Sequence, residues 1–283
     1  MRRNIALLLV LVFLAASCLV AAKPALSSAD VTEDTWVSKA PMQQARAGLG
    51  VAVVNGKIYA IGGSTASGQY PPDAFAGGFV GTNEEYDTAM DTWTFKASMP
   101  TPRAHFAIAA YQNKIYCIGG AVGFTAVEGK PGFYSYITSG VNEVYDTVTD
   151  TWETRAPLPD DAMKFQAHVV NGKIYVMDWS YTYVYDPADD SWSLKKQMPS
   201  PSLLSSLVSA VVDDKIIVTG VFSYTTFEEQ RIMIYDTETD NWSQGSTGPT
   251  LVFESAAEAT KSAKAPKRVY VLTKVLQFVV RKF

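Results

Sequence analysis

The sequence is poor in the side chains on which metal and redox chemistry depend. Its 283 residues include two cysteines and two histidines. Cys18 lies in the apolar N-terminal segment, so Cys117 has no disulfide partner once that segment is cleaved, and we expect it to be a small core residue. His105 and His168 lie in different repeat units at positions that do not correspond, which favours a core or channel-lining role for both. We therefore expect no metal, no cofactor and no catalytic residues.

The sequence also lacks an excess of positive charge. It has 24 Lys and Arg against 28 Asp and Glu, a formal net charge of −4 at pH 7. Loss of residues 1–22 would remove two arginines and leave 22 basic against 28 acidic side chains, a formal charge of −6. This balance argues against nucleic acid as a partner.

Long apolar runs are missing beyond the N-terminus. Two arginines precede an uncharged run from Ile5 to Ala22 that ends in small residues, the pattern of a secretory signal peptide. We predict a signal peptide over residues 1–22, a linker over 23–33, and a secreted or cell-surface protein that contacts membrane only if the first segment stays uncleaved. An uncleaved anchor is one open alternative, since about 18 apolar residues just span a bilayer. A lipoprotein site at Cys18 is the other.

An eight-residue phrase recurs four times, with Tyr-Asp at its start and Trp seven residues after the Tyr. We predict that the Tyr ends one strand and that the Asp accepts backbone N–H bonds in the turn that follows. The Trp then begins the next strand, and the Trp and Tyr side chains fill the gap between neighbouring sheets, with the buried Trp residues as the dominant anchors. The repeated residues are Tyr86, Asp87 and Trp93; Tyr145, Asp146 and Trp152; Tyr185, Asp186 and Trp192; and Tyr235, Asp236 and Trp242.

A second phrase precedes each copy and indicates two strands joined by a tight turn. The runs KIYAIGG (57–63) and KIYCIGG (114–120) are rich in β-forming residues. Asn55-Gly56 and Asn171-Gly172 are strong hairpin signals, because both positions accept positive φ. Each unit therefore has four strands, a to d. The glycines that end strand b in the first two units suit positive φ or a close backbone approach, and they are Gly62, Gly63, Gly119 and Gly120.

Strand b ending in Gly-Gly, followed by Tyr-Asp and then by Trp, resembles the kelch repeat over residues 34–283. The third and fourth units depart from this pattern, with Met177-Asp178 and Thr219-Gly220 in place of Gly-Gly, and the last unit has no Tyr-Asp or Trp. The resemblance implies an all-β protein with a kelch-type β-propeller. It is similar to exported, prokaryotic-type kelch proteins without a BTB domain.

The two ends of the chain complement each other within this resemblance. Trp36 follows a turn like those of the repeats, whereas residues 251–283 supply strands a to c of a last unit and then stop. We predict five four-stranded blades, the last completed by the N-terminal strand, which removes an exposed sheet edge. An unclosed ring encoded by a truncated gene is the alternative.

The loops after strands b and d leave on the same rim of a propeller, because neighbouring strands run in opposite directions. In the first two units the loop after strand b is long and aromatic, and such side chains favour binding of a protein or glycan. A plug folded back onto the rim is the alternative. Two equivalent arginines there suit either a ligand carboxylate or a structural role. The candidate binding residues are Arg46, Arg103, His105, Tyr70, Phe75, Phe124, Tyr134, Tyr136 and Tyr224.

These observations favour an exported, non-catalytic monomer that binds a protein or glycan through this rim. The alternative is an enzyme, because the resemblance extends to secreted kelch-like propellers that include a sialic-acid epimerase or mutarotase. Arg46, Arg103 and His105 are the candidate site residues for that activity. The choice of function depends on the site and not on the fold.

Overall fold

The computed structural model describes residues 37–65, 78–130, 134–161, 166–177, 181–199, 206–221, 231–245, 256–259 and 269–272. The chain divides into two units, Met1–Lys39 and Ala40–Phe283. In the first unit, residues 37–39 form no helix or strand. The predicted signal peptide (1–22) and linker (23–33) lie outside the described residues. Among the described residues, no helix has the length and apolar character that a membrane crossing requires.

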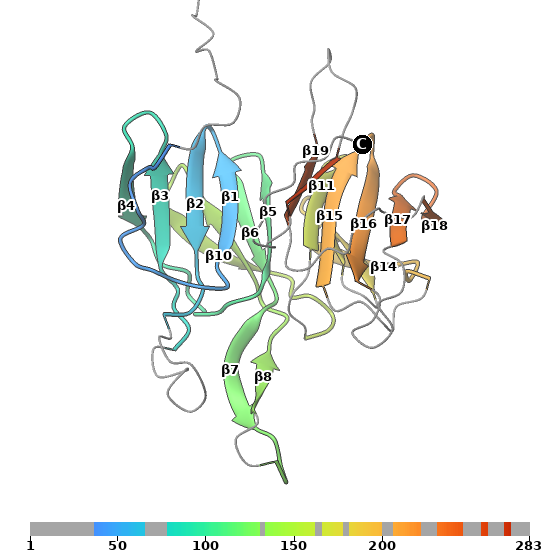
Figure 1. Ribbon diagram of the computed structural model, residues 1–283, viewed down its shortest axis with the longest axis horizontal. Coiled ribbons are helices and arrows are strands. Elements are labelled where there is room, and N and C mark those ends of the chain that lie inside the picture. The colour runs from blue at the N-terminus through green and yellow to red at the C-terminus, as the bar shows by residue number, and fades with distance from the viewer. Residues whose placement is uncertain are drawn as a thin grey trace, which may run out of the picture. The chain divides into compact units, whose positions relative to one another are not determined.

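The second unit contains four antiparallel sheets of four strands each, which we call blades 1 to 4 (Figure 1). Blade 1 has β1 (Gly50–Val54), β2 (Lys57–Ile61), β3 (Asn83–Asp87) and β4 (Thr92–Lys96). Blade 2 has β5 (Ala107–Tyr111), β6 (Lys114–Ile118), β9 (Asn142–Asp146) and β10 (Thr151–Arg155). Blade 3 has β11 (Gln166–Val170), β12 (Lys173–Met177), β13 (Thr182–Asp186) and β14 (Ser191–Lys195). Blade 4 has β15 (Ser206–Val212), β16 (Lys215–Val221), β17 (Arg231–Asp236) and β18 (Asn241–Gln244).

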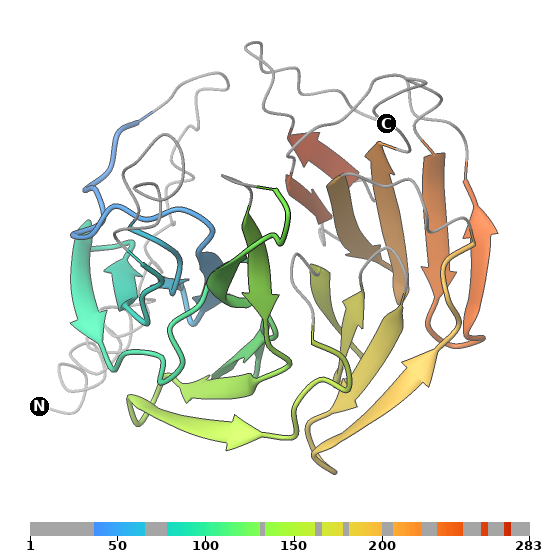
Figure 2. The same ribbon diagram turned by 90° about the horizontal axis from the view of Figure 1, so that it is seen from below.

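The blades follow one another in chain order and touch through their first strands (Figure 2). Strand β1 contacts β5, β5 contacts β11, and β11 contacts β15. A further pair, β19 (Ala256–Ala259) with β20 (Val269–Leu272), packs against β15. The predicted all-β fold of four-stranded propeller blades is therefore confirmed. Trp36 and residues 273–283, which are predicted to close a fifth blade, lie outside the described residues, and residues 37–39 form no strand. The blade count therefore stays a prediction.

Tight turns join the first two strands of each blade as the sequence predicts. Asn55 and Gly56 have φ angles of 51° and 76°, and Asn171 and Gly172 have 49° and 76°. Two successive positive φ angles match the right-handed twist of the flanking strands, which is why Asn-Gly is favoured here. Blade 4 makes the same turn with Asp213-Asp214, at 50° and 60°.

The Asp that follows each repeated Tyr organises the turn between strands c and d. Asp87 Oδ1 accepts N–H bonds from Ala89 at 2.9 Å and Met90 at 3.0 Å. The N–H groups of Met90 and Ala89 lower the pKa of Asp87, because they stabilise its charged form. The equivalent residues Asp146, Asp186 and Asp236 accept bonds from the residue two places further on. The predicted role of these aspartates is confirmed.

The packing between blades differs from the expectation that Trp is the main buried side chain. Tyr145, Tyr185 and Tyr235 are fully buried, whereas the repeated Trp residues stay partly exposed. Each Tyr faces a strand-b Tyr of the preceding blade, and the ring centroids of Tyr59 and Tyr145 are 5.9 Å apart. The Trp indole rests on the Tyr of its own blade, with centroids 4.9–5.1 Å apart in the four repeats. The Tyr therefore buries more of its ring because it lies one strand closer to the centre of the sheet.

A second Asp in the repeat, five residues after the Tyr, makes a contact that the sequence did not predict. Asp150 Oδ1 accepts the Tyr145 hydroxyl at 2.7 Å and the N–H of Ala97, in the preceding blade, at 2.8 Å. Trp152 Nε1 donates to the carbonyl oxygen of the same Ala97 at 2.7 Å. The next blade thus binds both the N–H and the C=O of a single residue that follows strand d. We call this arrangement of Asp and Trp the backbone clamp.

The backbone clamp recurs at every described blade. The clamping pairs and the residues that they hold are Asp91 and Trp93 on Ala40, Asp150 and Trp152 on Ala97, Asp190 and Trp192 on Ala156, and Asp240 and Trp242 on Lys196. Each held residue lies four positions after a Trp of the sequence, and for Ala40 that Trp is Trp36. Trp36 lies outside the described residues, so its assignment to a strand d stays a prediction.

Replacing Asp150 with Ala should destabilise the protein by about 2 kcal/mol, because the buried Tyr145 hydroxyl and the Ala97 N–H both lose their acceptor. Urea unfolding measures the change in free energy. The exposed Asp189 lies in the corresponding turn of blade 3, and Asp189→Ala serves as the control with little effect. Equal stability of the two variants would contradict the clamp.

Candidate binding rim

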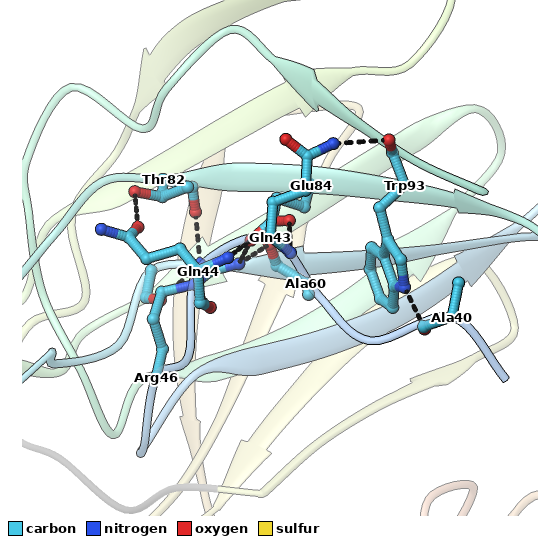
Figure 3. Close-up of polar contacts among 9 residues, drawn as sticks. Ala40, Gln43, Gln44, Arg46, Ala60, Thr82, Glu84 and Trp93 are labelled. Atoms are coloured by element: carbon cyan, nitrogen blue, oxygen red, sulfur yellow. Dashed lines mark hydrogen bonds and ion pairs between the residues drawn. The ribbon is translucent and has the colours of Figure 1, made fainter. Parts of the chain in front are cut away.

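The segments that lead from strand d of one blade to strand a of the next carry the two candidate arginines. Arg46 Nη1 donates to the carbonyl oxygens of Gly62 and Thr82, both at 2.7 Å, and its Nη2 lies 2.8 Å from Glu84 Oε1 (Figure 3). Neither side chain of the Arg46–Glu84 ion pair is exposed. The side chain of Gln44 is held nearby by the Thr82 hydroxyl, which donates to it at 2.6 Å.

Arg103 repeats this arrangement in blade 2. It forms an ion pair with Glu143, and its Nη2 donates to the carbonyl oxygen of Cys117 at 2.7 Å. Arg103 is fully buried, as is Cys117, which agrees with the expectation that this thiol is a core residue. Burial raises the pKa of the Cys117 thiol to about 12. Both arginines therefore pair with carboxylates of the chain itself and hold the end of strand b beneath the rim.

The repeats themselves show that each arginine and its glutamate form one unit. At the position of Glu84 and Glu143, two residues before the repeated Tyr, blade 3 has Tyr183 and blade 4 has Met233. The arginine is missing from the corresponding segments of the same two blades, where residues 156–165 and 196–205 contain none. The joint loss fits the physics, because one charge left alone in a buried site would cost several kcal/mol.

The long segment predicted as a loop between strands b and c of blade 2 forms a hairpin instead. Strands β7 (Ala121–Ala126) and β8 (Tyr134–Thr138) pair with each other, and the hairpin extends away from the four-stranded sheets (Figure 1). The residues of Tyr134–Thr138 favour β-structure and fit a strand. Glycines precede and follow this run in the sequence, and they made it look like part of a loop. The expectation of a loop after strand b of blade 2 is therefore wrong for residues 121–126 and 134–138.

Half-buried aromatic rings gather at the base of this hairpin. The Phe124 ring stacks on Phe79 with centroids 5.1 Å apart and lies 4.8 Å from Tyr136, and Tyr136 meets His105 edge-on at 5.6 Å. We call Phe79, His105, Phe124 and Tyr136 the aromatic cluster. Its members come from the segment after strand b of blade 1, the segment before strand a of blade 2, and both strands of the hairpin. The prediction that these segments share one rim agrees with these contacts.

His105 has a backbone role at the rim and does not line the inner strands. Its φ angle is 56°, and its N–H donates to the carbonyl oxygen of Gly48 at 2.8 Å. A Cβ atom on Gly48 would lie 2.8 Å from the His105 ring, so glycine is required there. His168 instead lies on the inner strand β11, with Nε2 2.6 Å from Ser209 Oγ on β15.

The exposed part of the rim comes from the hairpin and blade 3. Tyr134 and Ile137 are 38% and 45% exposed, and Tyr181, just before β13, is 43% exposed. The structure thus brings His105, Phe124 and Tyr136 into contact, and Tyr134 lies on the same strand as Tyr136. Arg46 and Arg103 are buried in ion pairs with Glu84 and Glu143. The candidates Tyr70, Phe75 and Tyr224 lie outside the described residues. The sequence did not indicate Tyr181, because the segment before β13 is too short to be predicted as a binding loop.

Comparison with known proteins identifies the repeat. A family model described as the Kelch motif matches residues 45–100 and 102–159, which cover blades 1 and 2. The chain therefore contains kelch repeats. The two matched kelch repeats are those that keep Gly-Gly at the end of strand b.

Other kelch-repeat proteins are similar to it over larger parts of the chain. It is 30% identical over 159 residues to Kelch-like protein terF of Aspergillus terreus, covering 50% of this chain and 33% of that protein. It is 23% identical over 257 residues to Beta-scruin of Limulus polyphemus, covering 84% and 26%. The solved structure titled "Structure of YjhT" matches with a TM-score of 0.57 and 15% identity, over 80% of this chain and 72% of that one, which shows the kelch propeller fold alone. The chain spans about a third of the length of the first curated relatives that it matches.

Breaking one buried ion pair tests the structural role of the arginines. Arg103→Leu should destabilise the protein by about 3 kcal/mol, because Glu143 is then left buried without its partner. The double variant Arg103→Leu with Glu143→Met, which copies the apolar residue of blade 4, should recover most of that loss. Urea unfolding measures both. A single variant as stable as the wild type would show that the ion pair does not support the rim.

Acidification tests the environment of His168. Burial lowers the pKa of His168 from its ordinary value of 6.5 to about 4, so the folded protein holds this side chain neutral. Protonation then favours the unfolded chain, and the free energy of unfolding should fall between pH 6.5 and pH 4, by at most about 1.4 kcal/mol per pH unit from this group. His168→Gln should unfold with a shallower pH dependence over this range. An unchanged dependence would place His168 in contact with water.

Proposed function

We propose that this kelch-repeat protein is an exported, non-catalytic module that binds a protein partner through the rim formed by the aromatic cluster and the β7–β8 hairpin. Kelch-repeat propellers generally bind proteins, and the relatives carry the same repeat. Export rests on the apolar segment of residues 1–22. A glycan is the other ligand class that exposed aromatics suit.

The observation that carries the proposal is that the hairpin presents exposed apolar side chains while its own position is fixed by the aromatic cluster. Tyr134 and Ile137 are exposed on β8, while Tyr136 between them on the same strand packs into the aromatic cluster. The hairpin is therefore held at its base, and the side chains that it presents lose little further freedom on binding. Ile137 offers an aliphatic surface, which favours a protein side chain over a sugar ring.

The enzyme alternative receives no support from this geometry. Arg46 and Arg103, two of its three candidate residues, pair with Glu84 and Glu143 and are buried. A guanidinium group held in this way has no exposed surface for a substrate carboxylate.

A peptide-display selection on the folded protein, followed by affinity measurement for a selected peptide, tests the proposal. Tyr134→Asp and Ile137→Asp should each weaken binding about tenfold or more, because each removes an apolar contact at the rim. Val148→Asp is the matched control, since Val148 is 72% exposed in the turn between strands c and d of the same blade. Equal losses in all three variants, or peptides that bind as well to the rim variants as to the wild type, would count against the rim. A glycan array run in parallel identifies the other ligand class.

A further inference from the structure

Charge is distributed differently on the two rims of the blades. On the rim opposite the hairpin, a Lys at the start of strand b pairs with the Asp at the end of strand c in each of four blades. The pairs are Lys57–Asp87, Lys114–Asp146, Lys173–Asp186 and Lys215–Asp236. The negative charges that end strand c are therefore largely neutralised by the chain itself.

The hairpin rim carries carboxylates that are not neutralised in this way. Glu128, Asp160 and Asp161 are exposed, and none of the ion pairs in the described part of the chain includes them. Asp160 and Asp161 stand together in the segment between β10 and β11. Lys130 lies two residues after Glu128 near the hairpin tip and balances its charge in number, so we take the Asp pair as the uncompensated negative charge among the described residues of this rim.

Hydrogen bonds hold both aspartates in place, and Asp160 is bonded to a tyrosine that packs against the exposed Tyr181. Asp161 Oδ1 accepts the N–H of Gly140, just after the hairpin, at 2.6 Å. Asp160 Oδ2 accepts the hydroxyl of Tyr183, whose ring lies 5.8 Å from that of the exposed Tyr181. Each of these bonds uses one oxygen of a carboxylate, and the described residues supply no bond to the other oxygen.

A carboxylate near an exposed aromatic ring favours the binding of a cationic side chain. An arginine or lysine gains from the carboxylate through a charge-assisted hydrogen bond and from the ring through a cation–π contact. Arginine fits better, because its planar guanidinium stacks on rings and binds carboxylates through two N–H groups. The apolar side chains of the hairpin would contact the neighbouring residues of the same partner segment.

We infer that the hairpin rim binds a positively charged, arginine-containing segment of a protein partner, with Asp160, Asp161 and Tyr181 contacting the arginine. This inference rests on the proposed function and specifies the chemistry of the partner. It commits to a protein segment, because Tyr134 and Ile137 add exposed apolar surface on the hairpin whose base the Asp161 bond secures.

The test uses the full chain and fluorescein-labelled peptides of about twelve residues, built from Gly, Ser and Leu with interspersed arginines. A matched peptide has glutamates in place of the arginines. Fluorescence anisotropy should show binding of the arginine peptide that weakens as NaCl is raised, and no comparable binding of the glutamate peptide.

Isosteric variants separate charge from structure. Asp160→Asn with Asp161→Asn keeps the acceptors for Tyr183 and Gly140 while removing both charges, and should weaken binding of the arginine peptide about fivefold. Tyr181→Ala should weaken it about threefold. The control Asp189→Asn removes one exposed charge on the opposite rim and should leave the affinity unchanged.

The inference is overturned if the glutamate peptide binds equally well, or if the double Asn variant binds the arginine peptide as the wild type does. The proposed function has a separate outcome. If selected neutral peptides still lose affinity in Tyr134→Asp and Ile137→Asp, the rim binds proteins and only the preference for arginine is wrong.

Discussion

The structure depends on one repeated contact, in which a blade holds the backbone of the blade before it. An Asp accepts the N–H and a Trp donates to the C=O of a single residue that follows strand d. Because both bonds involve main-chain atoms, the held residue can differ, and it is Ala in three cases and Lys196 in the fourth. The contact also determines where the next segment begins, and so where Arg46 and Arg103 enter the interior.

The same Asp couples this contact to the core. Although burial opposes it, the hydrogen bonds from Tyr145 and from the N–H of Ala97 lower the pKa of Asp150 below its ordinary value. Burial in turn raises the pKa of Tyr145, which keeps its hydroxyl protonated and able to donate. A group with a lowered pKa stabilises the fold above its ordinary pKa and loses that contribution as the pH falls through the lowered value. Acid therefore weakens the contact between blades.

The fold could be predicted from the sequence because its signals are local and repeated. Asn55-Gly56 and the aspartate after each Tyr act within a few residues, so their roles follow from turn chemistry alone. The role of Asp150 was missed because its partner, Ala97, lies 53 positions away. The same reason explains the misjudged tryptophans: which ring is most buried depends on the neighbouring blade and not on the repeat phrase.

The candidate site was predictable in part. The rim and four of its residues followed from strand direction and loop composition, because both are properties of the repeat. The charge pairs of Arg46 and Arg103 were not visible in that way, since the partners Glu84 and Glu143 read as ordinary strand residues. A comparison of the four blades at this one position could have identified these glutamates, because Tyr183 and Met233 replace them in blades 3 and 4.

The closed base of the β7–β8 hairpin has a consequence for how such a protein diversifies. Ala121 pairs with Thr138, and the N–H of Ser139 donates to the carbonyl oxygen of Gly120 at 3.0 Å. The two ends of the inserted hairpin are therefore hydrogen-bonded to each other where they meet blade 2, and these bonds do not involve the residues between them. We therefore expect this position to accept segments of other lengths and compositions at little cost to the blade, and so to be a suitable insertion point for new binding specificities.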